Sequence, residues 1–95
     1  MRRITIDCRG VRSSEDFWQR YVDVVQSRNA RDFGRNLDAF RDAIEAEGPG
    51  WPGEVRLTFG HSADLQTIMS GNGRSLLDNL RDLASDATRV EIELA

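Results

Sequence analysis

Three short segments in which polar and apolar residues alternate constrain the fold of this chain more than any other feature. They are Arg3–Asp7, Glu54–Phe59 and Arg89–Leu94. Alternation with a period of two is typical of strands that bury one face. In each segment one face is aliphatic or aromatic, whereas the other is charged or carries Thr. The sequence therefore predicts a sheet that is covered on one side only.

The segments between these strands carry apolar residues at helical spacing, which predicts helices as the connections. A first helix follows Ser14, its expected N-cap, and a second helix starts near Asn36 and ends before Gly48. Further along, Ser62 is expected to cap a short helical turn, and a Leu-rich helix follows Gly71-Asn72-Gly73. Long helical connections join parallel strands. We therefore predict a two-layer α/β fold, with a three-stranded parallel sheet of order 1-2-3 and helices in the crossovers, as one domain over residues 1–95.

Composition and charge narrow the class of protein. No apolar run approaches the ~20 residues of a membrane span, and the N-terminus lacks the apolar stretch of a signal peptide, so we expect a cytoplasmic protein with no membrane role. The single cysteine, Cys8, excludes an internal disulfide and a cysteine-based zinc site. Residues 32–95 carry 12 Asp or Glu against six Arg. Such a region does not attract nucleic acid directly, but it can attract a basic protein.

The second predicted helix has an unusual outer face. Asp38, Asp42 and Glu45 lie at i, i+4 and i+7, so three like charges follow one stripe. The apolar positions of this helix are Leu37, Phe40 and Ile44. At about 100° per residue, the acidic stripe lies well over 100° from the apolar one and is expected to face solvent. Like charges at this spacing cost a few tenths of a kcal/mol, so folding does not require the stripe.

An ordinary structural interpretation of the same residues stays open on physical grounds. Asn36 can serve as an N-cap and Asp38 as an acid at a helix start. Asp42 and Glu45 can belong to a solvated surface. Gly34 permits a tight or left-handed entry into the helix.

Residues 33–42 read Phe-Gly-Arg-Asn-Leu-Asp-Ala-Phe-Arg-Asp. This stretch resembles the core signature of the barstar family, aromatic-Gly-x-Asn-Leu-Asp-Ala-x-x-Asp at a loop-to-helix junction. The similarity continues along the chain, through the N-terminal and middle strands to Asn72-Gly73, the Leu-rich helix and the last strand. It implies the fold predicted above. It also implies an antitoxin- or immunity-type protein that blocks a basic ribonuclease by protein–protein contact, catalyses nothing and uses no cofactor or metal.

The resemblance also implies which residues bind the partner. In the family, the signature helix and the loop before it enter the nuclease active site, where acidic side chains take the place of RNA phosphates. By position, Asp38 and Asp42 are acidic contacts with Asp42 at the centre, and Asp82 on the last helix is a further one. Gly34 and Asn36 lie where the loop and helix start touch the nuclease. The predicted partner-binding residues are Asp32, Phe33, Gly34, Asn36, Leu37, Asp38, Arg41, Asp42, Glu45 and Asp82.

Two positions depart from the best-known member of the family. Asp32 stands where that member has a second aromatic residue, and Arg41 stands where it has a large aromatic that packs against the nuclease. Arg41 can pair with Asp38 or Glu45 by its spacing, and its charge repels a basic surface. The departures therefore predict a different nuclease target.

Two other functions remain as alternatives. In one, Asp38 and Asp42 hold Mg²⁺ or act as an acid–base pair in an enzyme, although Arg41 is the only cation between them in the sequence. In the other, a barstar-like scaffold binds a different basic protein. In either binding hypothesis we expect the free protein to be a monomer.

Overall fold

The computed structural model describes residues 2–26 and 30–95, and its sheet confirms the predicted topology. The strands are β1 (Arg2–Asp7), β2 (Val55–Gly60) and β3 (Glu91–Leu94). They lie in the order β1-β2-β3, and both pairs are parallel. Ile4 pairs with Leu57, and Leu57 pairs with Ile92, so one apolar row crosses all three strands. This row faces the helices, because alternate side chains point to the same side of a sheet.

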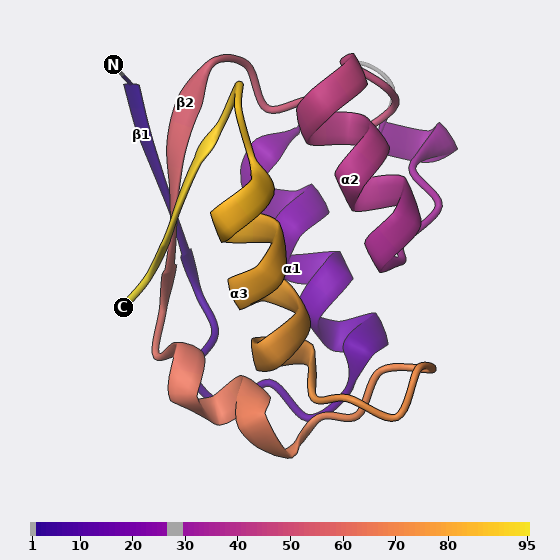
Figure 1. Ribbon diagram of the computed structural model, residues 1–95, viewed down its shortest axis with the longest axis vertical. Helices are drawn as coiled ribbons and strands as arrows, with labels where there is room; N and C mark the ends of the chain where they lie inside the picture. The colour runs from indigo at the N-terminus through magenta and orange to yellow at the C-terminus, as the bar shows by residue number, and fades with distance from the viewer. Residues whose placement is uncertain (1, 27–29) are drawn as a thin grey trace.

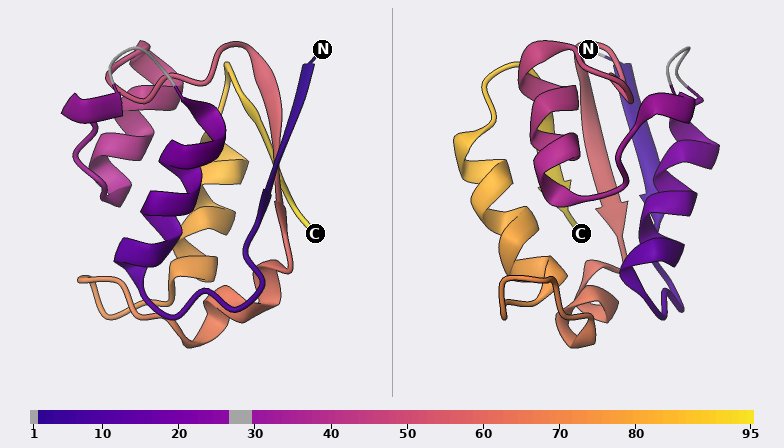
Figure 2. Two further views of the ribbon diagram at one scale, coloured as in Figure 1. Left: turned by 180° about the vertical axis from the view of Figure 1, so that it is seen from behind. Right: turned by 90° about the vertical axis from the view of Figure 1, so that its right-hand side faces the viewer.

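The helices cover one face of the sheet and leave the other open (Figure 1). The elements are α1 (Ser14–Val25), η1 (Ala30–Asp32), α2 (Leu37–Ala46), η2 (Ser62–Thr67) and α3 (Leu76–Asp86), of which η1 and η2 are short 3-10 helices. Seen from the helical side, α2 lies in front, with α1 and α3 on either side of it and the sheet behind (Figure 2). The outer side of α2 therefore faces away from the sheet.

A cluster of aromatic side chains joins the helices to the sheet. Phe17 of α1 and Phe40 of α2 are fully buried, and their ring centroids lie 5.5 and 6.4 Å from that of Phe59 in β2. Phe40 also contacts Tyr21 of α1, with centroids 5.2 Å apart. Burying one such side chain contributes about 1.5–3 kcal/mol. Apolar burial thus fixes α2 against both α1 and the sheet.

The predicted helix caps are correct at one position and wrong at two. Asn36 caps α2 as expected. The cap of α1 is Ser13, whose Oγ accepts a hydrogen bond from the Asp16 N–H at 3.1 Å, so the prediction of Ser14 was one residue late. Ser62 does not cap η2, because its hydroxyl donates to the Ala95 carbonyl at 2.9 Å. No helix in the described part of the chain is long and apolar enough to cross a membrane.

Candidate functional site

The loop that enters α2 is held by contacts within the loop itself. The Asn36 Oδ1 accepts a hydrogen bond from the Ala39 N–H at 2.7 Å, and its Nδ2 donates to the Gly34 carbonyl at 3.2 Å. Arg35, and not Gly34, takes the left-handed conformation, with φ of 53°. Gly34 is needed for space instead, since a Cβ there would lie 3.0 Å from the Cβ of Ala39. These contacts fix the direction in which α2 leaves the loop.

The inner side of α2 belongs to the core. Phe40, Ala43 and Ile44 are all buried. Phe33, which we predicted as a partner-binding residue, is also part of this core: it is 4% exposed, and its ring centroid lies 5.5 Å from that of Tyr21 and 5.7 Å from that of Trp18. Its aromatic side chain therefore anchors the loop and does not lie on the surface.

The outer side of α2 presents Asp38, Arg41 and Asp42, all three exposed. The Asp38 and Asp42 carboxylates take part in no side-chain hydrogen bond or ion pair with residues 2–26 and 30–95. Asp38 lies in the first turn, where the helix dipole favours a negative charge. The helix dipole does not explain the negative charge of Asp42.

The Asp42 carboxylate lies against the backbone just beyond the end of α2. A Cβ placed on Gly48 would come 1.9 Å from the Asp42 Oδ2, so only glycine leaves room for the carboxylate in this position. The negative end of the helix dipole lies there too, which disfavours an anion. The structure thus contains an exposed carboxylate that folding does not require and that a glycine makes room for. The sequence alone gives no signal for Gly48, because it lies in a run that also reads as an ordinary helix stop.

The sequence predicts that Glu45 continues the acidic stripe, but in the structure its side chain is bound to another part of the fold. Its carboxylate accepts hydrogen bonds from the Thr88 N–H at 2.8 Å and the Thr88 hydroxyl at 2.7 Å, and these bonds lower the pKa of Glu45. Glu45 therefore ties α2 to the loop between α3 and β3. The predicted three-acid stripe is reduced to Asp38 and Asp42.

Asp82 lies across a cleft from the outer side of α2. The cleft, of about 230 Å³, is lined by Asp38 and Arg41 of α2, by Asp82 of α3, and by Arg74 of the loop before α3. Arg74 forms an ion pair and hydrogen bond with Asp82, which lowers the pKa of Asp82 and raises that of Arg74. The sequence analysis missed Arg74, since a loop arginine has no periodic signal.

Leu37 and Asp32, the remaining predicted residues, differ in burial. Leu37 is half-buried, packs against the core and contributes to the cleft wall. Asp32 is exposed in η1, directly before the buried Phe33. Asp32 and Phe33 are thus neighbours in sequence that point to solvent and to the core, respectively.

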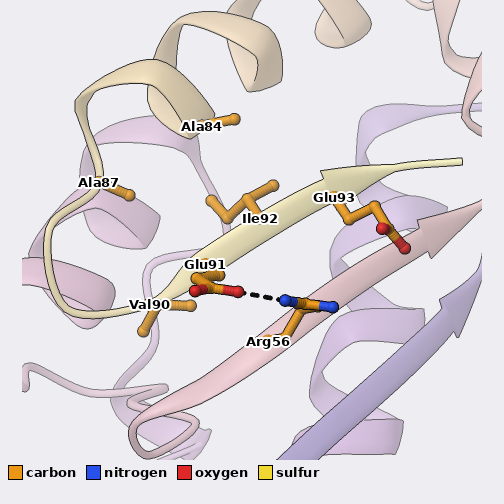
Figure 3. A pocket seen from close by; sticks show the side chains of 7 residues that line it. All are labelled: Arg56, Ala84, Ala87, Val90, Glu91, Ile92 and Glu93. Carbon is orange, nitrogen blue, oxygen red and sulfur yellow. Dashed lines mark hydrogen bonds and ion pairs between the residues drawn. The ribbon is translucent and has the colours of Figure 1, made fainter. Parts of the chain in front are cut away.

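A second hollow, of about 400 Å³, lies beside β3 and contains none of the predicted residues (Figure 3). Its walls include Ala84, Ala87 and Ile92, and two of its charged members pair with each other: the Arg56 Nε donates to a Glu91 carboxylate oxygen at 2.8 Å. In the described ranges of the chain, no group of three or more His, Cys, Asp or Glu side chains could hold a metal ion. The charged cleft beside α2 is therefore the stronger candidate for binding.

Comparison with known proteins places the chain in one family. A search of curated proteins gives no match. Comparison with protein families matches residues 1–95 to Barstar, the barnase inhibitor family. This match agrees with the parallel sheet of order β1-β2-β3 and with the signature at the start of α2. The chain belongs to the Barstar family, whose members are inhibitors of a ribonuclease and not enzymes.

Proposed function

We propose that this protein is an antitoxin- or immunity-type inhibitor that blocks the active site of a basic ribonuclease with the outer side of α2. The observation that supports this most is Asp42: an exposed carboxylate at a disfavoured place on the helix, seated over Gly48. Asp38 lies one turn before it on the same side. Together they present two negative charges on the side of α2 that faces away from the sheet.

The chemistry of ribonucleases explains why carboxylates suit this task. A ribonuclease must hold the phosphate of RNA, so its active site carries cationic side chains. A carboxylate forms charge-assisted hydrogen bonds with the same cations, and complementary charge speeds the encounter of the two proteins. In the inhibited complex, Asp42 and Asp38 then occupy the positions that RNA phosphates take when the nuclease binds its substrate.

The single cysteine of the chain fits an intracellular inhibitor. Cys8 is fully buried in the core, and burial raises the pKa of its thiol to about 12, which keeps it unreactive. A reduced, inert cysteine suits the cytoplasm, where we expect the protein to neutralise its nuclease.

The test is RNA cleavage by a panel of small basic ribonucleases, including any encoded beside this gene, titrated with the purified protein. We expect stoichiometric inhibition of at least one nuclease. Asp42→Ala should weaken that complex by about 2 kcal/mol or more, roughly 30-fold, a magnitude taken from interface hot spots in general, the complex of barnase with its inhibitor among them.

The matched control is Glu93→Ala. Glu93 is an exposed acid on the open face of the sheet, away from the helices, so its removal should leave inhibition unchanged. Equal effects of the two variants would indicate a general charge effect and contradict a contact at α2. If the protein inhibits none of the nucleases, the proposal is wrong and another basic protein becomes the partner to seek.

A further inference from the structure

Arg41 interrupts the acidic side of α2, and the structure holds it only loosely. Its Nη1 lies 3.9 Å from the Asp86 Oδ2, beyond hydrogen-bond distance, and the two side chains are 54% and 66% exposed. Exposed pairs of this kind contribute about 0–1 kcal/mol. Arg41 is therefore free to turn toward a partner, and fold stability does not explain its presence.

The cleft between α2 and α3 brings a second arginine to the same place. Arg41 and Arg74 both line it, together with the apolar side chains of Leu37 and Leu83. Arg74 is fixed by its ion pair with Asp82, which also offsets the charge of Asp82. Each guanidinium has five N–H donors, and Arg74 spends one on Asp82, so both arginines keep donors for a further acceptor.

Of the other polar groups that line the cleft, Asn72 and Asn79 pair with each other, whereas Asp38 forms no side-chain hydrogen bond or ion pair with the described residues. The Asn72 Nδ2 donates to the Asn79 Oδ1 at 3.0 Å, and the Asn79 Nδ2 donates back to the Asn72 Oδ1 at 3.2 Å. Each of these amides keeps one neutral N–H, so among the described lining residues the arginine N–H groups are the charged donors that remain available. Guanidinium groups match the geometry of carboxylates and phosphates, and of these two a protein partner supplies a carboxylate.

The order of charges on α2 disfavours a partner that is cationic throughout. Such a surface would be attracted by Asp38 and Asp42 but repelled by Arg41, which lies between them in sequence. We propose that the partner places a carboxylate side chain in the cleft between Arg41 and Arg74, next to the cations that meet Asp38 and Asp42. A cleft of about 230 Å³ is large enough for one such side chain. This inference rests on the proposed function and specifies its target: a nuclease with an acidic residue among its active-site cations.

The experiment uses the nuclease that the unaltered protein inhibits and measures the dissociation constant by calorimetry. Arg41→Gln keeps most of the side chain's length and removes its charge, and it should weaken binding at least tenfold. Arg41→Glu should weaken binding further. The control, Arg3→Gln, removes an exposed arginine from β1 on the open face of the sheet and should leave binding unchanged. Melting temperatures establish that each variant folds.

A charge swap then identifies the partner's group. Each Asp or Glu in the nuclease active site is changed to Lys in turn, and one of these changes should restore binding to Arg41→Glu while weakening the unaltered inhibitor. If Arg41→Gln binds as tightly as the unaltered protein or more tightly, while Asp42→Ala still weakens the complex, the partner is cationic throughout and the inference is wrong. If Asp42→Ala also has no effect, the proposed function itself fails.

Discussion

The two sides of α2, a helix of ten residues, differ in what determines their side chains. On the inner side, Phe40, Ala43 and Ile44 are at most 1% exposed, and each packs against other parts of the core. On the outer side, Asp38 and Asp42 are exposed and unpaired within the described residues, and Arg41 is held only by a distant ion pair. The inner side is therefore determined by folding. The outer side is free to be determined by a partner.

Removal of the Phe40 ring tests the inner side and should have the largest effect. Phe40→Ala deletes a fully buried ring that contacts Trp18, Tyr21 and Phe59. We expect a loss of about 3–5 kcal/mol in the free energy of unfolding, measured with urea, because the cavity cannot fully close. The dissociation constant of the nuclease complex, expressed per folded molecule, should change little.

The matched variant on the outer side is Asp38→Ala, which should change the free energy of unfolding by no more than about 0.5 kcal/mol. The comparison of the two sides breaks down if Asp38→Ala destabilises the fold as much as Phe40→Ala does. It also breaks down if the folded Phe40→Ala variant binds the nuclease tenfold more weakly.

Gly48→Ala sharpens the comparison, because it should alter binding through Asp42 without touching the core. The added Cβ would lie 1.9 Å from the Asp42 Oδ2, so the carboxylate must move. Gly48 is not among the glycines with a positive φ, so its backbone conformation suits alanine and the contact with the Asp42 carboxylate is the main obstacle. We expect binding to weaken about tenfold, equivalent to about 1.4 kcal/mol, with the melting temperature nearly unchanged.

The double variant Gly48→Ala with Asp42→Ala separates this mechanism from a direct contact of Gly48. If Gly48 acts only through Asp42, adding Gly48→Ala to Asp42→Ala should have no further effect on the dissociation constant. Additive losses would show that Gly48 has its own contact with the partner.

The sequence predicts what depends on local periodicity and misses what depends on distant contacts. Alternation located the three strands, and the 3.6-residue period separated the inner from the outer side of α2. The bonds of Glu45 join residues 43 positions apart, and no local pattern reports such a pair. Phe33 shows a further limit: a signature residue can serve the core as well as the interface, and its spacing does not tell which. The predicted Ser14 cap failed because Ser13 and Ser14 are chemically equivalent in sequence and only backbone geometry distinguishes them.

The smallest expected effect concerns Glu45, whose carboxylate accepts hydrogen bonds from Thr88 and so stabilises the fold. Hydrogen bonds from Thr88 lower the pKa of Glu45 from its ordinary value of 4.5. A carboxyl whose pKa is lower in the folded state than in the unfolded state stabilises the fold above the ordinary value, and this contribution is lost as the pH falls through the lower value. Glu45→Gln should therefore reduce the melting temperature slightly at pH 7, and the difference from the unaltered protein should shrink as the pH falls below about 4.5.

Asp42→Asn is the control: it removes a carboxylate from the same helix without removing a hydrogen bond to the described residues, so at pH 7 it should lower the melting temperature less than Glu45→Gln does. A larger loss for Asp42→Asn would mean that the acid assigned to the partner serves the fold instead, and the distinction between the two acids would have to be reversed.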